Sequence, residues 1–248
     1  MPTPFTHMEV AQRLLDDTTI PAEMRAFLHD QLPAYVLGSI AADARVGSGA
    51  KRHVTHFYDY TDPIPEPPWR VMVRANPHLM DPHDAAHRAF IAAYVAHLSV
   101  DEVWSLQMVR PHFAKREWAN RQHRFFMLHI ILTVMDERDR DRIMPWYADA
   151  LCEATPHNWL DFITDEDLRK WQSIIFEQVK PGGKSQTLTI FSERTAVAAD
   201  RFRHILDSTE TLQQQLWQHI SPAYLTQIEA AYYEHARGQM IAYLSETT

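Results

Sequence analysis

The chain has 248 residues, of which 46% are apolar and 23% are charged, so it can bury a sizeable core in one compact domain, and intrinsic disorder is not expected. Its 24 basic and 32 acidic residues give a net charge of −8, which argues against a nucleic-acid partner or an anionic membrane held by charge. The one cysteine, Cys152, rules out an intrachain disulfide and a cysteine-based zinc site, and we expect it in the core.

The N-terminal stretch "MPTPFTHMEVAQRLL" has neither the basic nor the apolar segment of a secretory signal. No apolar run approaches the roughly 20 residues of a membrane span, so we expect no transmembrane segment and a cytoplasmic location. Histidine is the compositional outlier, with 15 residues, and eleven of them precede residue 130. Any chemistry is therefore expected in the N-terminal half.

Helical periodicity dominates the chain from its beginning. The first helix is expected to open with a capping box formed by Thr6 and Glu9. His7 shares a stripe with Ala11 and Leu14 at helical spacing, so its side chain should face inward.

A second helix is predicted over about 21–32 and a third over about 33–47, where Gly47 would end it. The third helix carries the small-residue run "GSIAADA", which lets another helix approach closely. Asp43 lies near the end of this run.

Residues 47–83 are predicted to form a long irregular stretch that contains "THFYDYTDP". A loop of this length in a compact domain is usually functional. The strongest helical pattern follows, from about 84 to 109, and carries His97 and Asp101 four residues apart on one face. The same face holds three aromatic residues, Phe90, Tyr94 and Trp104. This face, and the His–Asp pair with it, should therefore point inward.

Further helices are predicted at about 115–135, around "RIMPWYADALCEA", and as three long patterns in the last hundred residues. The chain shows no internal repeat and no flexible linker. The sequence thus predicts a single all-α domain over residues 1–248, a multi-helix bundle. We expect the metal-site half to cover about 1–137 and the C-terminal helical half about 138–248.

Five polar residues at inward or loop-tip positions are candidate metal ligands. They are His7, Asp43, His56, His97 and Asp101. Imidazole nitrogens and carboxylate oxygens suit zinc, iron or manganese. Buried histidine and aspartate side chains also need compensation, which a metal ion supplies.

The order of these motifs resembles the zinc-dependent phospholipase C family, all-α metallohydrolases related to the P1-type nucleases. The matching pieces are "HMEVAQRLL", "LGSIAADA", "THFYDYTDP" and "AFIAAYVAHLSVDEVW", within roughly residues 5–105. The resemblance implies a phospholipase C/P1 nuclease-like fold in the N-terminal half. It implies that the principal zinc is bound by four of the candidates, Asp43, His56, His97 and Asp101. It also implies that His7 serves an adjacent metal together with Asp101.

The sequence departs from this family at Gln107, which stands where the family has a histidine. The family's later His-x-x-x-Glu pair is missing as well, because His123 is followed four residues on by Met127. We therefore expect one or two ions rather than three. His123 is a candidate additional ligand, since it lies on a predicted helix that could face the metals.

These features predict a metal-dependent hydrolase of a small or lipid-like phosphoester substrate, in which the metal activates water and Asp43 orients it. One alternative is a metal-binding scaffold of the same fold without turnover, which the loss of the second-site histidines favours. Another is an HD-type phosphohydrolase using His83 and Asp84 in "HDAAH", although Pro82 indicates that these residues begin a helix. The sequence leaves the oligomeric state open.

Overall fold

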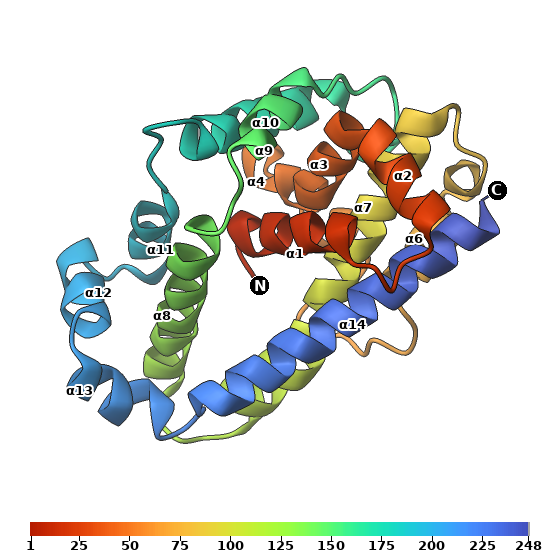
Figure 1. The fold of residues 1–248 in the computed structure, drawn as a ribbon. Coiled ribbons are helices and arrows are strands. Elements are labelled where there is room, and N and C mark those ends of the chain that lie inside the picture. The colour runs from red at the N-terminus through yellow and green to blue at the C-terminus, as the bar shows by residue number, and fades with distance from the viewer. Residues whose placement is uncertain (248) are drawn as a thin grey trace.

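Helix α7 (Ala85–Val103) runs through the middle of the fold, and nearly all of its residues are buried (Figure 1). The computed structural model describes residues 1–247 and contains no β-strand in that range. The single all-α domain predicted from the sequence is therefore confirmed. The proposed division of that domain near residue 137 stays a prediction.

The other elements surround α7. The α-helices are α1 (Pro4–Asp16), α2 (Ala22–Asp30), α3 (Leu32–Ala41), α4 (Arg45–Ser48), α5 (Arg52–His56), α6 (Pro68–Ala75), α8 (Arg121–Arg140), α9 (Trp146–Glu153), α10 (Asp165–Val179), α11 (Thr187–Thr195), α12 (Ala199–Leu206), α13 (Thr209–Leu212) and α14 (Pro222–Glu246). Short 3₁₀ turns are η1 (Ala42–Ala44) and η2 (Pro77–Met80), and π-helical segments are η3 (Trp104–Lys115) and η4 (Gln213–Trp217).

Close packing of α3 on α7 depends on the small-residue run of α3. A Cβ atom added at Gly38 would lie 2.2 Å from the carbonyl oxygen of Phe90, well inside van der Waals contact. The two backbones therefore approach at a distance that only glycine permits. The expectation that this run would allow a close helix neighbour is confirmed.

Helix α14, the 25-residue C-terminal helix, extends along α7 over much of its length (Figure 1, blue and yellow). At one end of the contact, the guanidinium of Arg88 donates from Nη2 to the carbonyl oxygen of Leu244 at 2.6 Å. At the other end, Nε2 of His235 lies 2.9 Å from a carboxylate oxygen of Glu102. Segments distant in sequence thus enclose the central helix.

The start of α1 differs from the predicted capping box. The helix begins at Pro4, and its N-cap residue Thr3 makes no side-chain cap bond. The hydroxyl of Thr6 instead donates to Oδ2 of Asp139 on α8, at 2.8 Å. The capping box is wrong because a tertiary partner engages the hydroxyl that would have capped the helix.

The stretch 47–83 is less irregular than predicted, since it contains α5, α6 and η2. Gly49, with φ of 73°, ends α4 in place of Gly47. Phe57 ends α5 immediately after His56 and has φ of 61°, a left-handed conformation that is uncommon for a residue with a Cβ.

Two other predicted features also change. Helix α7 continues into η3 rather than ending near residue 109, and α8 begins only at Arg121, where the side chain of Asn120 accepts from the backbone N–H of His123. Cys152 is exposed rather than in the core, because α9 buries the face formed by Tyr147 and Leu151. Within residues 1–247, no helix has the length and apolarity needed to cross a bilayer.

Substitution of Gly38 by alanine should destabilise the fold, because the new methyl group would overlap the Phe90 carbonyl group. Overpacking of this kind costs about 1–3 kcal/mol in the free energy of unfolding. Gly47→Ala is the matched control, since nothing lies within 4 Å of the added Cβ and the glycine is in a helix. Guanidinium denaturation compares the two variants, and an equal effect of both would contradict the close approach.

Candidate metal centre

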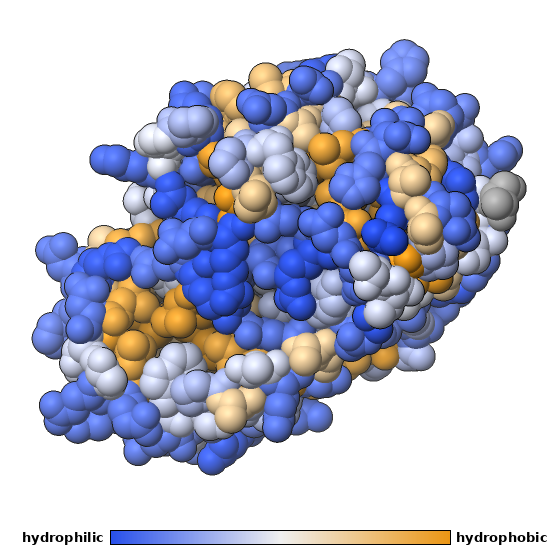
Figure 2. Space-filling model, in the orientation of Figure 1, coloured by the Kyte–Doolittle hydropathy of each residue, from blue (hydrophilic) through white to orange (hydrophobic). Residues whose placement is uncertain are grey.

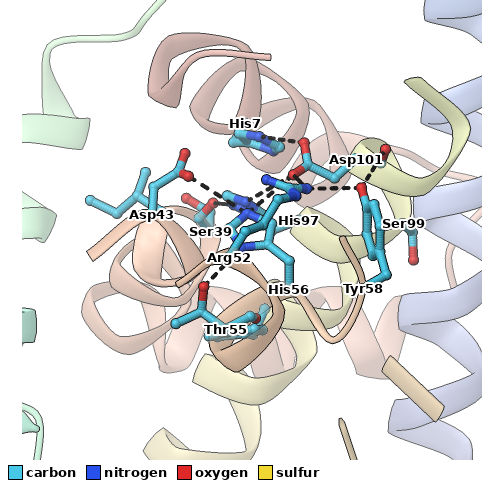
Figure 3. Close-up of polar contacts among 12 residues, drawn as sticks. His7, Ser39, Asp43, Arg52, Thr55, His56, Tyr58, His97, Ser99 and Asp101 are labelled. Carbon is cyan, nitrogen blue, oxygen red and sulfur yellow. Dashed lines mark hydrogen bonds and ion pairs between the residues drawn. The ribbon is translucent and has the colours of Figure 1, made fainter. Parts of the chain in front are cut away.

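Five side chains from four elements converge beside α7 (Figure 3). Helix α1 supplies His7, the turn η1 supplies Asp43, α5 supplies His56, and α7 supplies His97 and Asp101. The three imidazoles and the Asp101 carboxylate are almost completely buried, whereas the Asp43 side chain is 13% exposed. The structure therefore brings together all five candidate ligands, although they are spread over residues 7–101 of the sequence.

The potential ligand atoms lie within a few ångströms of one another. Nε2 of His56 is 3.2 Å from Oδ2 of Asp101 and 3.6 Å from Oδ1 of Asp43. Nε2 of His7 is 3.4 Å from Oδ1 of Asp101, and Nε2 of His97 is 4.0 Å from Oδ2 of the same carboxylate. The imidazole of His7 also stacks on that of His97, with ring centroids 3.6 Å apart.

These atoms form two overlapping groups that could hold a metal ion, each with its ligand atoms within 4.8 Å of one another. One group is His7, His97 and Asp101, and the other is Asp43, His56 and His97. The shared residue is His97, and because its Nδ1 lies 2.8 Å from the backbone carbonyl oxygen of Ser39, only the single lone pair of Nε2 is left for an ion. The two groups therefore cannot both be complete at the same time, and one ion drawing on both is the simplest occupancy.

Several of these atoms are buried polar atoms without a partner. Nε2 of His7, His56 and His97 and Oδ1 of Asp101 make no hydrogen bond to any residue within 1–247. Buried polar atoms in folded proteins are nearly always hydrogen-bonded, because a lost bond leaves an uncompensated desolvation cost. Three imidazole nitrogens and a carboxylate oxygen that face one another in this way form a donor set that could hold a metal ion.

Hydrogen bonds at the opposite ring nitrogens fix the orientation of two imidazoles. Nδ1 of His97 lies 2.8 Å from the backbone carbonyl oxygen of Ser39. A carbonyl oxygen only accepts, so Nδ1 carries the proton and Nε2 presents its lone pair to the centre. Nδ1 of His56 is similarly 2.8 Å from the hydroxyl of Thr55, whose backbone carbonyl oxygen accepts from the hydroxyl of Tyr94. Metal-ligating histidines are characteristically held in this way.

Burial sets the charge of the centre. It lowers the pKa of His56 to about 4, with Arg52 acting in the same direction. It lowers the pKa of His97 to about 3, and His7 adds to the shift. Burial alone would raise the pKa of Asp101, but Arg52, His56 and His7 together outweigh burial and hold that pKa well below its usual range. Neutral imidazoles and an ionised carboxylate are the protonation states that bind a metal.

Arg52 belongs to this centre and was not among the predicted site residues. Its Nη2 donates to Oδ2 of Asp101 at 2.7 Å and to the hydroxyl of Tyr58 at 2.8 Å. The Tyr58 hydroxyl donates in turn to the backbone carbonyl oxygen of Asp101, at 3.0 Å. Arg52 lies four residues before His56, which places both on one face of α5. This four-residue spacing from a candidate ligand is the sequence pattern that could have indicated Arg52 as a site residue.

The remaining predicted site residues lie elsewhere. His123 is in the first turn of α8, near the indole of Trp118, and is in neither group of potential ligands. Asp84 is the N-cap of α7 and accepts from the backbone N–H of His87, so it serves as a helix start, as the preceding proline indicates. His53, which is close to His56 in sequence but was not a candidate ligand, is half exposed and faces Asp59 at the surface.

A cavity of about 90 Å³ reaches the centre at Asp43. Residues from the N-terminus, α10 and α11 line it together with Tyr60. A second cavity, of about 890 Å³, shares Tyr60, Arg45 and Arg194 with the first. Its walls include apolar residues of α8, and Figure 2 shows an apolar hollow over α8 with hydrophilic side chains beside it. The exposed edge of the centre thus faces open space.

Comparison of the chain with known protein families, with curated protein sequences and with solved structures gave no match. The character of the centre therefore follows from its residues and their geometry alone.

Removal of a central imidazole should abolish metal binding. His97→Ala deletes the ligand common to both potential groups. Loss of a residue that only orients a ligand can lower metal affinity by about 100-fold, so we expect loss of the ligand itself to lower it by at least that much. His53→Ala is the control, because this half-exposed histidine lies outside the centre and should leave affinity unchanged. His123→Ala should cost less metal than His97→Ala. Metal content after dialysis measures all three, and equal losses from His53→Ala and His97→Ala would contradict the assignment.

Acidification should destabilise the metal-free protein between about pH 6.5 and pH 4. Within that window the unfolded chain protonates His56 and His97, whereas the folded protein, with pKa values of about 4 and 3, keeps them neutral. The unfolded state binds more protons, so the free energy of unfolding falls as the pH falls, by up to about 1.4 kcal/mol per pH unit for each imidazole.

Denaturation in the presence of a chelator, repeated at several pH values, measures this slope. His97→Gln removes one of the imidazoles that titrate only in the unfolded state, so its slope should be shallower than that of the unsubstituted protein. Equal slopes would show that His97 is not held neutral by the fold.

Proposed function

We propose that this protein is a metal-dependent hydrolase of phosphoester-like substrates. The observation that carries the proposal is the set of buried ligand atoms without hydrogen bonds: Nε2 of His7, His56 and His97 and Oδ1 of Asp101. We further propose that one ion is held by Asp43, His56, His97 and Asp101, with His7 adjoining it. Zinc fits this nitrogen and oxygen donor set best, and iron or manganese would fit it as well.

A bound ion of this kind supplies Lewis acidity to a phosphoryl oxygen and lowers the pKa of a bound water toward about 7. The residues of the chain would provide the rest. We assign Asp43 to orienting the water, because its carboxylate borders the cavity of about 90 Å³ while the Asp101 side chain is fully buried. Ser39 and Thr55 would keep the ligand imidazoles turned toward the centre.

The resemblance of the four N-terminal motifs to the zinc-dependent phospholipase C family supports the choice of reaction class. We propose that the chain is a remote member of that family. The apolar wall of the larger cavity would accommodate the non-phosphate part of a small or lipid-like substrate.

A metal-binding scaffold without turnover is the second candidate, and one observation favours it. The ligand atoms of the three histidines and Asp101 are almost inaccessible, and Arg52 occupies one oxygen of the Asp101 carboxylate. Such a centre could bind a metal for stability alone.

Hydrolysis assays separate the two candidates. Protein loaded with zinc or manganese should hydrolyse at least one of a chromogenic phosphate diester, a phosphate monoester and a phosphocholine ester. Asp43→Asn, assayed at a metal concentration that keeps its centre loaded, should reduce the rate. Protein of confirmed metal content that turns over none of the three would overturn the hydrolase and favour the scaffold.

Metal removal should lower the melting temperature. At about a thousandfold excess over Kd, an ion that binds only the folded state adds roughly 4 kcal/mol, which corresponds to about 8 °C or more for a chain of this size. Asp101→Asn should blunt the response to chelator, whereas Asp59→Asn, a half-exposed carboxylate outside the centre, should preserve it. Identical melting of loaded and stripped protein would leave the metal proposal without support.

A further inference from the structure

The guanidinium of Arg52 is only partly used by the protein. The guanidinium donates two hydrogen bonds, both from Nη2, to Asp101 and to Tyr58. Nε and Nη1 are buried and have no hydrogen-bond partner among residues 1–247. A guanidinium carries five N–H donors, so three of them remain available at a residue that is only 5% exposed.

Two aromatic rings fix the position of this guanidinium. Its Cζ lies 4.8 Å from the ring centroid of Tyr58 and 4.8 Å from that of Tyr60. Together with the bond to Asp101, these contacts hold the guanidinium beside a candidate metal ligand, and Figure 3 shows the side chain reaching to Asp101.

The charge of a loaded centre would not be balanced by its own residues. Asp43 and Asp101 contribute two negative charges and Arg52 one positive charge, and metal-bound imidazoles are neutral. A divalent ion would turn this net charge of −1 into +1. A buried positive charge without a counter-charge is unfavourable, so the loaded centre would favour an added anion, which a metal-bound hydroxide or an oxyanion could supply.

We propose that Arg52 is the anion-binding residue of this centre and that it holds an oxyanion of the phosphate class against the bound metal. The inference rests on the proposed metal centre and extends it by naming the group that recognises the ligand's charge. Hydrogen bonds between a guanidinium and a phosphate oxygen are charge-assisted and directional, which suits an arginine better than a lysine at this position.

Access for such an anion lies beside Tyr60. This side chain packs on the guanidinium from one side, is 44% exposed, and lines both the small and the large cavity. Asp43 borders the same small cavity. Arg52 itself lines neither cavity, so an oxyanion that enters past Tyr60 would meet Asp43 first and would reach the guanidinium once the Tyr60 ring that packs on it moves aside.

The test uses full-length protein loaded with zinc, freed of excess ion, and checked for metal content. Calorimetric titration then measures the affinity for inorganic phosphate and for dimethyl phosphate, a stand-in for a diester. Arg52→Gln removes the charge and most donors, whereas Arg52→Lys keeps a charge beside Asp101 but loses the planar fork. Arg124→Gln is the matched control, because Arg124 is equally buried but donates from Nε and Nη1 to backbone carbonyl oxygens.

We expect both Arg52 variants to retain zinc and to bind the oxyanions about tenfold or more weakly, the size expected for losing one hydrogen bond to a charged group. Arg52→Gln should also bind zinc more tightly, since it removes a neighbouring positive charge. Arg124→Gln should match the unsubstituted protein in both respects. Circular dichroism verifies folding, and if Arg52→Gln fails to fold, Arg52→Lys decides.

Zinc-loaded protein whose oxyanion affinity is the same in the Arg52 variants would overturn the assignment of Arg52 and leave the metal centre standing. Zinc-loaded protein that binds neither oxyanion would overturn it as well. Failure of the unsubstituted protein to bind zinc would instead overturn the proposed function, and this inference with it.

Discussion

The ionised carboxylate of Asp101 is the constraint around which the N-terminal part of the fold is organised. It is completely buried on the central helix, and an isolated charge in such a place would cost several kcal/mol. Arg52 lies against one of its oxygens, and the imidazoles of His7 and His56 approach the two oxygens from α1 and α5. Two elements that precede α7 in the chain, α1 and α5, thus meet at one carboxylate, and their convergence forms most of the candidate centre.

The close packing of α3 on α7 serves the same centre. The contact at Gly38 brings the carbonyl oxygen of the next residue, Ser39, within hydrogen-bonding distance of His97. A larger residue at position 38 would move that oxygen away and release the imidazole. Apolar packing and the orientation of a ligand are therefore set by one interhelical contact rather than by separate features.

The spacing of apolar residues was sufficient to predict that the fold is helical and that His7, His97 and Asp101 point inward, because the buried face of a helix follows directly from residue spacing. Local signals failed where a distant partner competed for the same group. The hydroxyl of Thr6 bonds to Asp139 on α8 instead of capping its own helix. Arg52 was missed for a related reason: arginine is ordinarily a surface residue, and only the tertiary placement of Asp101 and Tyr58 makes its burial favourable.

The arrangement of α14 beside α7 has a consequence for how the chain folds during synthesis. All five candidate ligands have been made by residue 101, yet one long side of α7 is covered by Pro222–Glu246. Until these residues have been synthesised, the central helix has an apolar side without its partner, and contacts of such long sequence separation form slowly. The candidate ligands are therefore encoded early in the chain, whereas the helix that carries two of them completes its packing only after Pro222–Glu246 has been synthesised.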